Sequence, residues 1–248
     1  EGELMFKLYN NIIAEKLDKS DKAVVASFVK HKKFNPYTAF LAGGNLCWKN
    51  STKDYINLVL VEKIFFNKRG DKVWDCSENF AVEGKVIKAR YMTKIWVKRP
   101  DTDDSVCKIV SVKNMNRSDN SFYNNQEFYV SKIESWDEIQ LTDTITAKDI
   151  VINREDLYTC FDYAYATTIH RSQGSTITAP YSINDWNDRL SRKLKYVAVS
   201  RTSDKENIQI NPKWEHRVPV IKTKNSWELN RRLMIETIKE GRWFPKKK

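Results

Sequence analysis

The chain has 248 residues, of which 41% are hydrophobic and 12% aromatic, so it can build a sizeable core and is not a disordered chain. Its 43 lysines and arginines outnumber its 32 aspartates and glutamates, which gives a formal net charge of +11. An excess of this size points to a polyanionic partner, nucleic acid ahead of a membrane surface, and a basic protein without such a partner is the alternative.

Four cysteines are dispersed along the chain, at positions 47, 76, 107 and 160. They form no C-x-x-C pair and have no histidine at metal-ligand spacing, so neither a metal site nor a disulfide framework is expected, and we predict a reduced, intracellular protein. No apolar run approaches the ~20 residues that span a bilayer, and no signal peptide is visible. Because the sequence begins with glutamate rather than methionine, we expect a part of a longer protein.

The first part of the chain has the pattern of an α/β domain. Its elements are a helix over residues 4–17, a segment at 22–30, a turn at Gly43-Gly44, a buried strand over 45–48 and a helix over 54–66. The polar turn at Lys49 and Asn50 is interpreted either as a helix cap or as a ligand contact.

Residues 70–149 are predicted to form a small β-barrel or β-sheet insertion, because short β-branched and aromatic runs alternate there with polar turns. The pair Asn124-Asn125 predicts a tight hairpin, since asparagine tolerates a positive φ. One basic strand face either follows a phosphate backbone or forms a solvated edge. It consists of Lys85, Lys88, Arg90, Lys94, Lys98 and Arg99.

The α/β pattern returns over residues 150–225, and a C-terminal helix with a basic tail is predicted over 226–248. The predicted elements are a strand over 160–168, a polar helical turn over 185–193, an apolar strand over 194–200, a last strand over 206–210 and an amphipathic helix over 226–240 that Gly241 ends.

The stretch YATTIHRSQGS, residues 165–175, carries the first block of candidate chemistry. Thr168 and His170 at a strand end are compact donors suited to phosphate or sugar oxygens, although a single histidine is more often structural. Gly174 lets backbone N–H groups approach a ligand closely, and Gln173 can donate and accept at once.

The stretch LKYVAVSRT, residues 194–202, carries the second block. Arg201 follows its predicted strand, so the guanidinium is expected at a strand's carboxyl end, where ligands bind in doubly wound folds. An arginine there is suited to clamp a transferring phosphoryl group. The seven glycines form neither G-x-x-x-x-G-K-[ST] nor G-x-G-x-x-G.

Together the two blocks resemble motifs V and VI of superfamily 1 helicases of the RecD/Dda/PIF type. The usual forms are T-[IV]-H-[KR]-[ST]-Q-G-[SL] and Y-V-[AG]-[LV]-[ST]-R-[AT], and this chain has TIHRSQGS and YVAVSRT. NLCWKNSTKDYINLVLVEKI resembles motif IV of the same family. YNNQEFYVSKI is similar to the Y-N-G-E-x-x-x-V hairpin of its SH3-like insertion, with Asn125 in place of the usual glycine. The resemblance covers roughly residues 40–210, in the family's order.

This resemblance implies an α/β fold: the second RecA-like motor domain (P-loop NTPase type) over residues 1–69 and 150–225, with an inserted SH3-like β-barrel domain over 70–149. Walker A and the D-E box, which the family carries in a preceding domain, are absent. The chain is therefore expected to be the C-terminal motor half of an ATP-dependent superfamily 1B helicase that moves 5′ to 3′ on single-stranded DNA. Its partners would be single-stranded DNA and the N-terminal RecA-like domain of the same protein, which would hold most of the ATP and Mg²⁺.

The resemblance also implies roles for individual residues. Arg201 would be the catalytic arginine finger on the γ-phosphate, and Gln173 and Gly174 would couple the ATP state to the grip on DNA. The expected nucleic-acid contacts, including two lysines from the basic strand face, are Asn50, Thr168, His170, Arg171, Ser172, Lys94 and Lys98. Thr176 stands where many relatives have glutamate, which leaves a ribose or base contact there open.

Two other functions stay open. One is a module without a motor that binds single-stranded nucleic acid or replication proteins, and the other is a helicase that acts on RNA. The many lysines, asparagines and isoleucines suggest an AT-rich genome such as that of a large DNA virus, with a nuclear or a cytoplasmic replication site.

Overall fold

The computed structural model describes residues 2–14, 16–30, 40–41, 44–65, 73–76, 78–89, 92–97, 106–117, 120–187, 189–211, 233 and 236. The chain divides into two compact units. The first comprises Glu1–Ile56, Tyr165–Arg217 and Trp243–Lys248, and the second comprises Asn57–Ala164 and Val218–Arg242.

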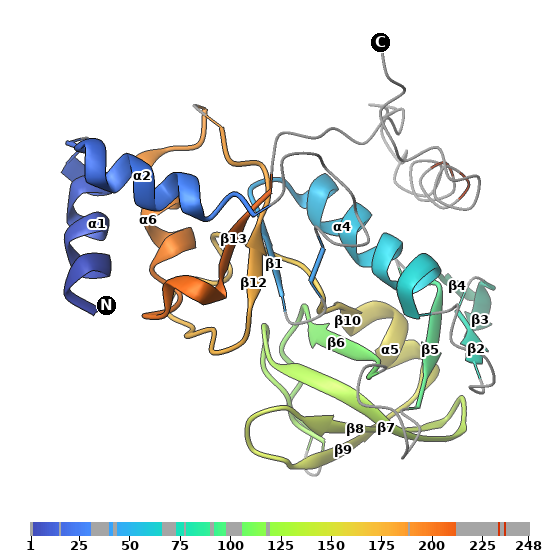
Figure 1. Ribbon diagram of the computed structural model, residues 1–248. Coiled ribbons are helices and arrows are strands. Elements are labelled where there is room, and N and C mark those ends of the chain that lie inside the picture. The colour runs from blue at the N-terminus through green and yellow to red at the C-terminus, as the bar shows by residue number, and fades with distance from the viewer. Residues whose placement is uncertain are drawn as a thin grey trace. The chain divides into compact units, whose positions relative to one another are not determined.

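The first unit is built on a parallel sheet of four short strands in the order β11-β1-β12-β13. Figure 1 labels three of them, β1, β12 and β13. In chain order these are β1 (Asn45–Cys47), β11 (Thr167–Thr168), β12 (Tyr181–Ile183) and β13 (Ile208–Ile210). β1 pairs in parallel with β11 and β12, and β12 pairs in parallel with β13. The carboxyl ends of the strands therefore meet at one edge of the sheet, and the predicted α/β class is confirmed.

The core of this unit forms between one face of the sheet and two helices, α1 (Gly2–Ala14) and α6 (Arg192–Val199). α1 contributes apolar residues at helical spacing. β1, β12 and β13 each contribute at least one buried residue, and the residue that follows β11 is buried in the same core. The buried set includes Met5, Leu8, Ile12, Leu46, Ile169, Ile183, Ala198, Val199 and Ile210. In the sequence, α2 (Lys19–Ser27) lies between α1 and β1, and it starts at a capping box made by Asp18 and Asp21.

Residues 194–200 lie in the helix α6 and its C-terminal end, so the strand predicted there is wrong. The Ser191 side chain caps this helix by accepting the Leu194 N–H at 3.4 Å. Leu194, Val197 and Ala198 share one helical face and pack into the core. Among the described residues of the helical turn predicted over 185–193, only the last two are helical. One of the two neighbours of β1 in the sheet is β12, a strand that the sequence analysis missed.

The helix after β1 is α4 (Asn50–Val59), which continues as a π-helix, η1 (Leu60–Phe65). The strand predicted over 45–48 and the helix predicted over 54–66 are therefore confirmed, although the helix begins earlier, at Asn50. Its apolar residues are buried almost without interruption, as Tyr55, Ile56, Leu58, Val59, Leu60 and Val61.

The second unit contains a five-stranded antiparallel sheet in the order β10-β6-β7-β8-β9 (Figure 1). The strands are β6 (Lys108–Ser111), β7 (Glu127–Ser135), β8 (Glu138–Asp143), β9 (Asp149–Ile152) and β10 (Phe161–Tyr163), with α5 (Arg154–Cys160) before β10. Two small sheets pair β2 (Val73–Asp75) with β5 (Lys94–Trp96), and β3 (Phe80–Val82) with β4 (Lys85–Ile87). The strand-rich character predicted for residues 70–149 is present, and their identity as an SH3-like barrel stays a prediction.

The tight turn at Asn124-Asn125 has the predicted backbone geometry. Asn125 has a φ of 76°, and the Gln126 N–H donates to the Tyr123 carbonyl at 3.1 Å. A residue at this turn position must adopt a positive φ, which asparagine tolerates better than most residues. The tight hairpin predicted between residues 122–123 and 128–130 is nevertheless wrong, because Phe122 forms a β-bridge with Met115 and β7 pairs with β6 instead.

The single strand predicted over 160–168 is wrong, because two strands from different sheets lie there. β10 pairs with β6, whereas β11 pairs with β1. The buried Tyr163 hydroxyl accepts the N–H groups of Thr93 and Lys94, each at 2.9 Å, and donates to the Lys94 carbonyl at 2.6 Å. Long-range pairing thus draws residues 150–164 into the second unit, whose first segment is Asn57–Ala164.

All four cysteines are free and buried. Burial raises the pKa of the Cys107 thiol to about 12 and also raises the pKa of the Cys47 and Cys76 thiols above their ordinary range. In the part of the chain that the structure describes, no helix is both long and apolar enough to cross a bilayer. The helix predicted over 226–240 lies outside the described residues, apart from Leu233 and Glu236, which are helical.

Candidate functional site

Two of the residues predicted to contact nucleic acid lie together at the carboxyl edge of the parallel sheet in the first unit. Asn50 follows β1, and His170 follows β11, which is the neighbour of β1 in the sheet. Both side chains are exposed, and so is that of Lys49. Because this is the edge at which open α/β sheets bind ligands, these residues form an accessible polar surface where the sequence analysis expected one.

Asp185 shapes the turn between β1 and α4. One of its carboxylate oxygens accepts the N–H groups of Trp48 at 3.1 Å and Lys49 at 3.2 Å, and the other accepts the Thr52 hydroxyl at 3.1 Å. Asp185 has a φ of 63°, a left-handed conformation that is uncommon outside glycine. The carboxylate therefore holds the start of α4, next to Asn50, from the neighbouring strand end.

Sequence reasoning missed Asp185. The available signal was its place after the apolar-polar alternation of residues 181–184, which indicates a strand end. The turn at Lys49-Asn50 is thus a helix start held by a distant carboxylate, and it leaves the Asn50 side chain exposed.

A buried chain of amides and hydroxyls fastens the three strands β1, β12 and β13 on the face opposite the core. The Asn211 amide donates to Asn184 at 2.9 Å, Asn184 donates to the Ser182 hydroxyl at 3.0 Å, and Ser182 donates to Asn45 at 2.7 Å. Asn45 in turn donates to the carbonyl of Tyr165 at 2.8 Å. Since every member of this chain is buried and bonded, it is a rigid support for the stretch that begins at Tyr165.

The stretch 168–175 is a compact turn that exposes some predicted residues and buries others. The Thr168 carbonyl accepts the N–H groups of Arg171 and Ser172, at 2.9 and 3.1 Å, and the Ser172 hydroxyl donates to the Ile169 carbonyl at 2.9 Å. Thr168 and Ser172 are buried, at 7% and 4% exposure, whereas His170 and Gln173 are exposed. The first pair therefore holds the turn in shape, and the second pair is open to a ligand.

Gly174 occupies a position in this turn that requires a positive φ. Its φ is 89°, and an added Cβ would meet no atom within 4 Å. The constraint is thus the backbone conformation rather than lack of space.

Replacing Gly174 by alanine is expected to lower the free energy of unfolding by about 1–2 kcal/mol and to weaken single-strand binding. Gly84→Ala is the matched control, since Gly84 has a φ of 76° and equally open surroundings in the second unit. Urea unfolding should show a similar loss for both variants, and oligonucleotide titration should show a loss for Gly174→Ala alone. Equal binding by the two variants would contradict a role for this turn.

Arg201 joins the two sequence blocks. It follows α6, and its guanidinium donates to the carbonyls of Ser172 at 3.1 Å, Ser175 at 3.0 Å and Val197 at 2.8 Å, and to the Ser200 hydroxyl at 2.9 Å. The contacts with Ser172 and Ser175 bracket the Gln173-Gly174 pair. The expected position at the end of a strand is therefore wrong, because the preceding segment is a helix, whereas the contact between the two blocks is direct.

All the protein atoms that the Arg201 guanidinium contacts in the described part of the chain are neutral oxygens, so its positive charge is not balanced by a carboxylate there. The next residue, Thr202, accepts the Tyr9 hydroxyl through its carbonyl at 2.6 Å. Burial raises the pKa of Tyr9 to about 12, so this hydroxyl stays a neutral donor. An arginine held by weak neutral partners can exchange them for an anionic ligand.

Of the two lysines of the basic strand face that were predicted to contact nucleic acid, one lies within the described residues. Lys94 lies on β5 in the second unit, where its Nζ is 3.4 Å from a carboxylate oxygen of the buried Glu62. Lys85 lies on β4, in a different small sheet, so the predicted face is not a single strand. Lys98 is outside the described residues. Among the described residues, no group of three or more histidine, cysteine, aspartate or glutamate side chains could hold a metal ion.

A parallel sheet with helices on its core face and polar side chains at its carboxyl edge makes the first unit an open α/β domain. No family model matches the sequence, and no curated protein sequence matches it. Solved structures do match, and all of those described below are Pif1 helicases.

The Bacteroides Pif1 helicase in complex with ADP-AlF3 and single-stranded DNA is 16% identical, with a TM-score of 0.54, over 84% of this chain and 48% of that one. Pif1 helicase from Candida albicans is 13% identical, with a TM-score of 0.52, over 95% of this chain and 57% of that one. A structure of two coordinating Pif1 helicases at forked double-stranded DNA is 19% identical, with a TM-score of 0.51, over 84% and 46%.

The chain therefore has the fold of part of these Pif1 helicases, and the resemblance found in the sequence is confirmed at the level of the fold. It spans about half the length of the helicases that it matches.

Proposed function

We propose that this chain is the C-terminal motor part of an ATP-dependent superfamily 1B helicase that moves 5′ to 3′ on single-stranded DNA and unwinds duplexes. The observation that carries the proposal is the contact of Arg201 with the carbonyls of Ser172 and Ser175. It joins a side chain that could bind a phosphate group to a turn that could bind single-stranded DNA. The Pif1 structures in complex with single-stranded DNA, and with ADP-AlF3, support both ligands.

In this proposal, ATP and Mg²⁺ are bound mainly by a preceding RecA-like domain of the same protein that carries Walker A and the D-E box. Residues 70–149, in the second unit, are the SH3-like insertion 2B, and Arg201 is the residue that this chain adds to the ATP site. The guanidinium would stabilise charge that develops on the γ-phosphate during hydrolysis.

The contacts of Arg201 suggest how the ATP state is coupled to the grip on DNA. When the guanidinium turns to a phosphate it must release the carbonyls of Ser172 and Ser175, which frees the turn around Gln173 and Gly174. Coupling of this kind is reciprocal, so strand binding at the turn changes the position of Arg201 in return. His170 and Asn50 are the exposed groups through which the strand is held, by hydrogen bonds to phosphate oxygens.

His170→Ala and Asn50→Ala are each expected to weaken binding of an oligothymidylate about 2- to 10-fold, the value of one lost hydrogen bond. Fluorescence anisotropy with the chain and a labelled oligonucleotide measures this. Asn10→Ala serves as the control, because Asn10 is an exposed asparagine on α1. Wild-type affinity in both site variants would show that single-stranded DNA does not bind at the carboxyl edge of the sheet.

The chain without the preceding domain should bind single strands and hydrolyse no ATP. Appreciable ATPase activity of the chain alone would show that the site is complete within it and would overturn the divided site. Binding of RNA in place of DNA would keep the motor proposal and change its substrate.

A further inference from the structure

Two tryptophans lie at the carboxyl edge of the sheet, one on each of two neighbouring strand ends. Trp48 directly follows β1, and Trp186 lies shortly after β12. These strands pair with Leu46 opposite Ile183, and Asp185, the neighbour of Trp186, accepts the N–H of Trp48. Since paired strands are about 4.8 Å apart, the two indoles come from adjacent positions on one edge.

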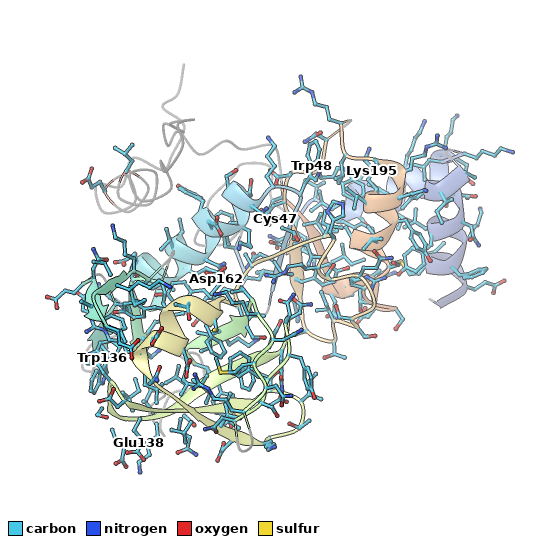
Figure 2. All side chains as sticks on the ribbon, turned by 180° about the vertical axis from the view of Figure 1, so that it is seen from behind. Cys47, Trp48, Trp136, Glu138, Asp162 and Lys195 are labelled. Carbon is cyan, nitrogen blue, oxygen red and sulfur yellow. The ribbon has the colours of Figure 1, made fainter. Side chains whose placement is uncertain are left out.

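Each indole is half-buried and has a lysine amino group above its ring. Part of each ring packs against the core of the first unit, and the remainder reaches solvent. The Lys49 amino group lies 5.8 Å from the centre of the Trp48 ring, and that of Lys195 lies 5.6 Å from the centre of the Trp186 ring. Figure 2 shows Trp48 and Lys195 at the same end of the first unit.

This set of side chains differs from a surface that reads only phosphates. Phosphate contacts need cations and hydrogen-bond donors, whereas partly exposed indoles add flat apolar faces. A lysine above such a face keeps water away from it and can swing to a nearby anion, which leaves the face to another π-system. Aromatic faces beside cations are the combination by which proteins bind single strands without reading their sequence.

Resting on the proposed function, we propose that Trp48 and Trp186 form a stacking platform for bases of the bound single strand, with Lys49 and Lys195 on the adjoining phosphates. The platform continues the row of exposed groups formed by Asn50 and His170. It predicts that part of the affinity comes from the bases and not from the backbone.

The test compares two strands of equal length and charge, an oligothymidylate and an abasic deoxyribose-phosphate strand, at one salt concentration. Trp48→Leu and Trp186→Leu keep apolar bulk but cannot stack, so each should weaken oligothymidylate binding about 5- to 100-fold. Binding of the abasic strand should stay within twofold of wild type. Trp48→Phe should restore part of the loss, because phenylalanine stacks. Trp136→Leu, in the second unit, is the matched control and should change neither affinity.

Each outcome bears on the platform in a defined way. If wild type binds both strands equally and the leucine variants bind as wild type, the platform is wrong and the strand-binding proposal stands. If wild type binds neither strand, the proposed function itself fails. Should a leucine variant not fold, quenching of indole fluorescence by oligothymidylate decides, since Trp48→Phe must then lose a measurable part of the quenching; unchanged quenching would overturn the platform.

Discussion

Replacing Arg201 by alanine is expected to lower ATP turnover by about 10³- to 10⁵-fold in the protein that also contains the ATP-binding domain, while ATP affinity changes little. The reason is that an arginine finger acts on charge that develops in the transition state and only weakly on bound ATP. Turnover is measured at saturating single-stranded DNA, and ATP affinity with a fluorescent analogue.

Arg192→Ala is the control, because Arg192 lies on the first turn of the same helix and donates to the Ile13 carbonyl at 3.3 Å. Normal turnover in Arg201→Ala would remove Arg201 from the ATP site. Arg201→Lys should also be inactive, since lysine keeps the charge but lacks the planar fork of donors that binds phosphate oxygens in a bidentate way. Without nucleotide, both Arg201 variants should bind single strands differently from wild type, because the turn around Gly174 loses its clamp.

Phe128→Ala is expected to lower the free energy of unfolding by about 3–5 kcal/mol, the largest stability loss that we predict for a single residue. Phe128 is fully buried, and its ring centre lies 6.4 Å from that of Phe122 and 5.9 Å from that of Phe161. These three rings pack β7, β10 and the Asn125 turn against one another. The substitution would therefore leave a cavity at the point where these three elements of the second unit meet. Urea unfolding followed by circular dichroism measures the change.

Tyr123→Ala provides the comparison, since Tyr123 is 69% exposed and its loss should change stability by less than about 0.5 kcal/mol. A similar small effect for Phe128→Ala would mean that the aromatic cluster does not stabilise this unit.

Local patterns predicted the elements whose signals are local. The helix α1, the strand β1 and the last strand β13 follow from spacing and from turn residues at their ends, and the structure places each within a few residues of its prediction. The positive φ of Asn125 follows in the same way, because the side chain and the turn position are neighbours in the sequence.

Two predictions failed because their deciding contacts are distant in sequence. A short apolar run such as 194–200 fits a strand or a helix equally well, and its burial against α1 together with the Ser191 cap selected the helix. The run 160–168 divides between two sheets because β6 and β1 each pair with one part of it. Pairing partners of this kind are not visible in a local window.

By itself, the sequence determined the α/β class, the two blocks around His170 and Arg201, and through them the resemblance to superfamily 1 helicases. Motifs report these features because they need particular residue types at fixed spacing. Only the tertiary structure decided that Thr168 and Ser172 are buried, that Asp185 holds the turn before Asn50, and that Arg201 binds the carbonyls around Gln173 and Gly174. Burial and hydrogen-bond partners depend on which strands and helices meet, and that is set by the packing of the whole unit.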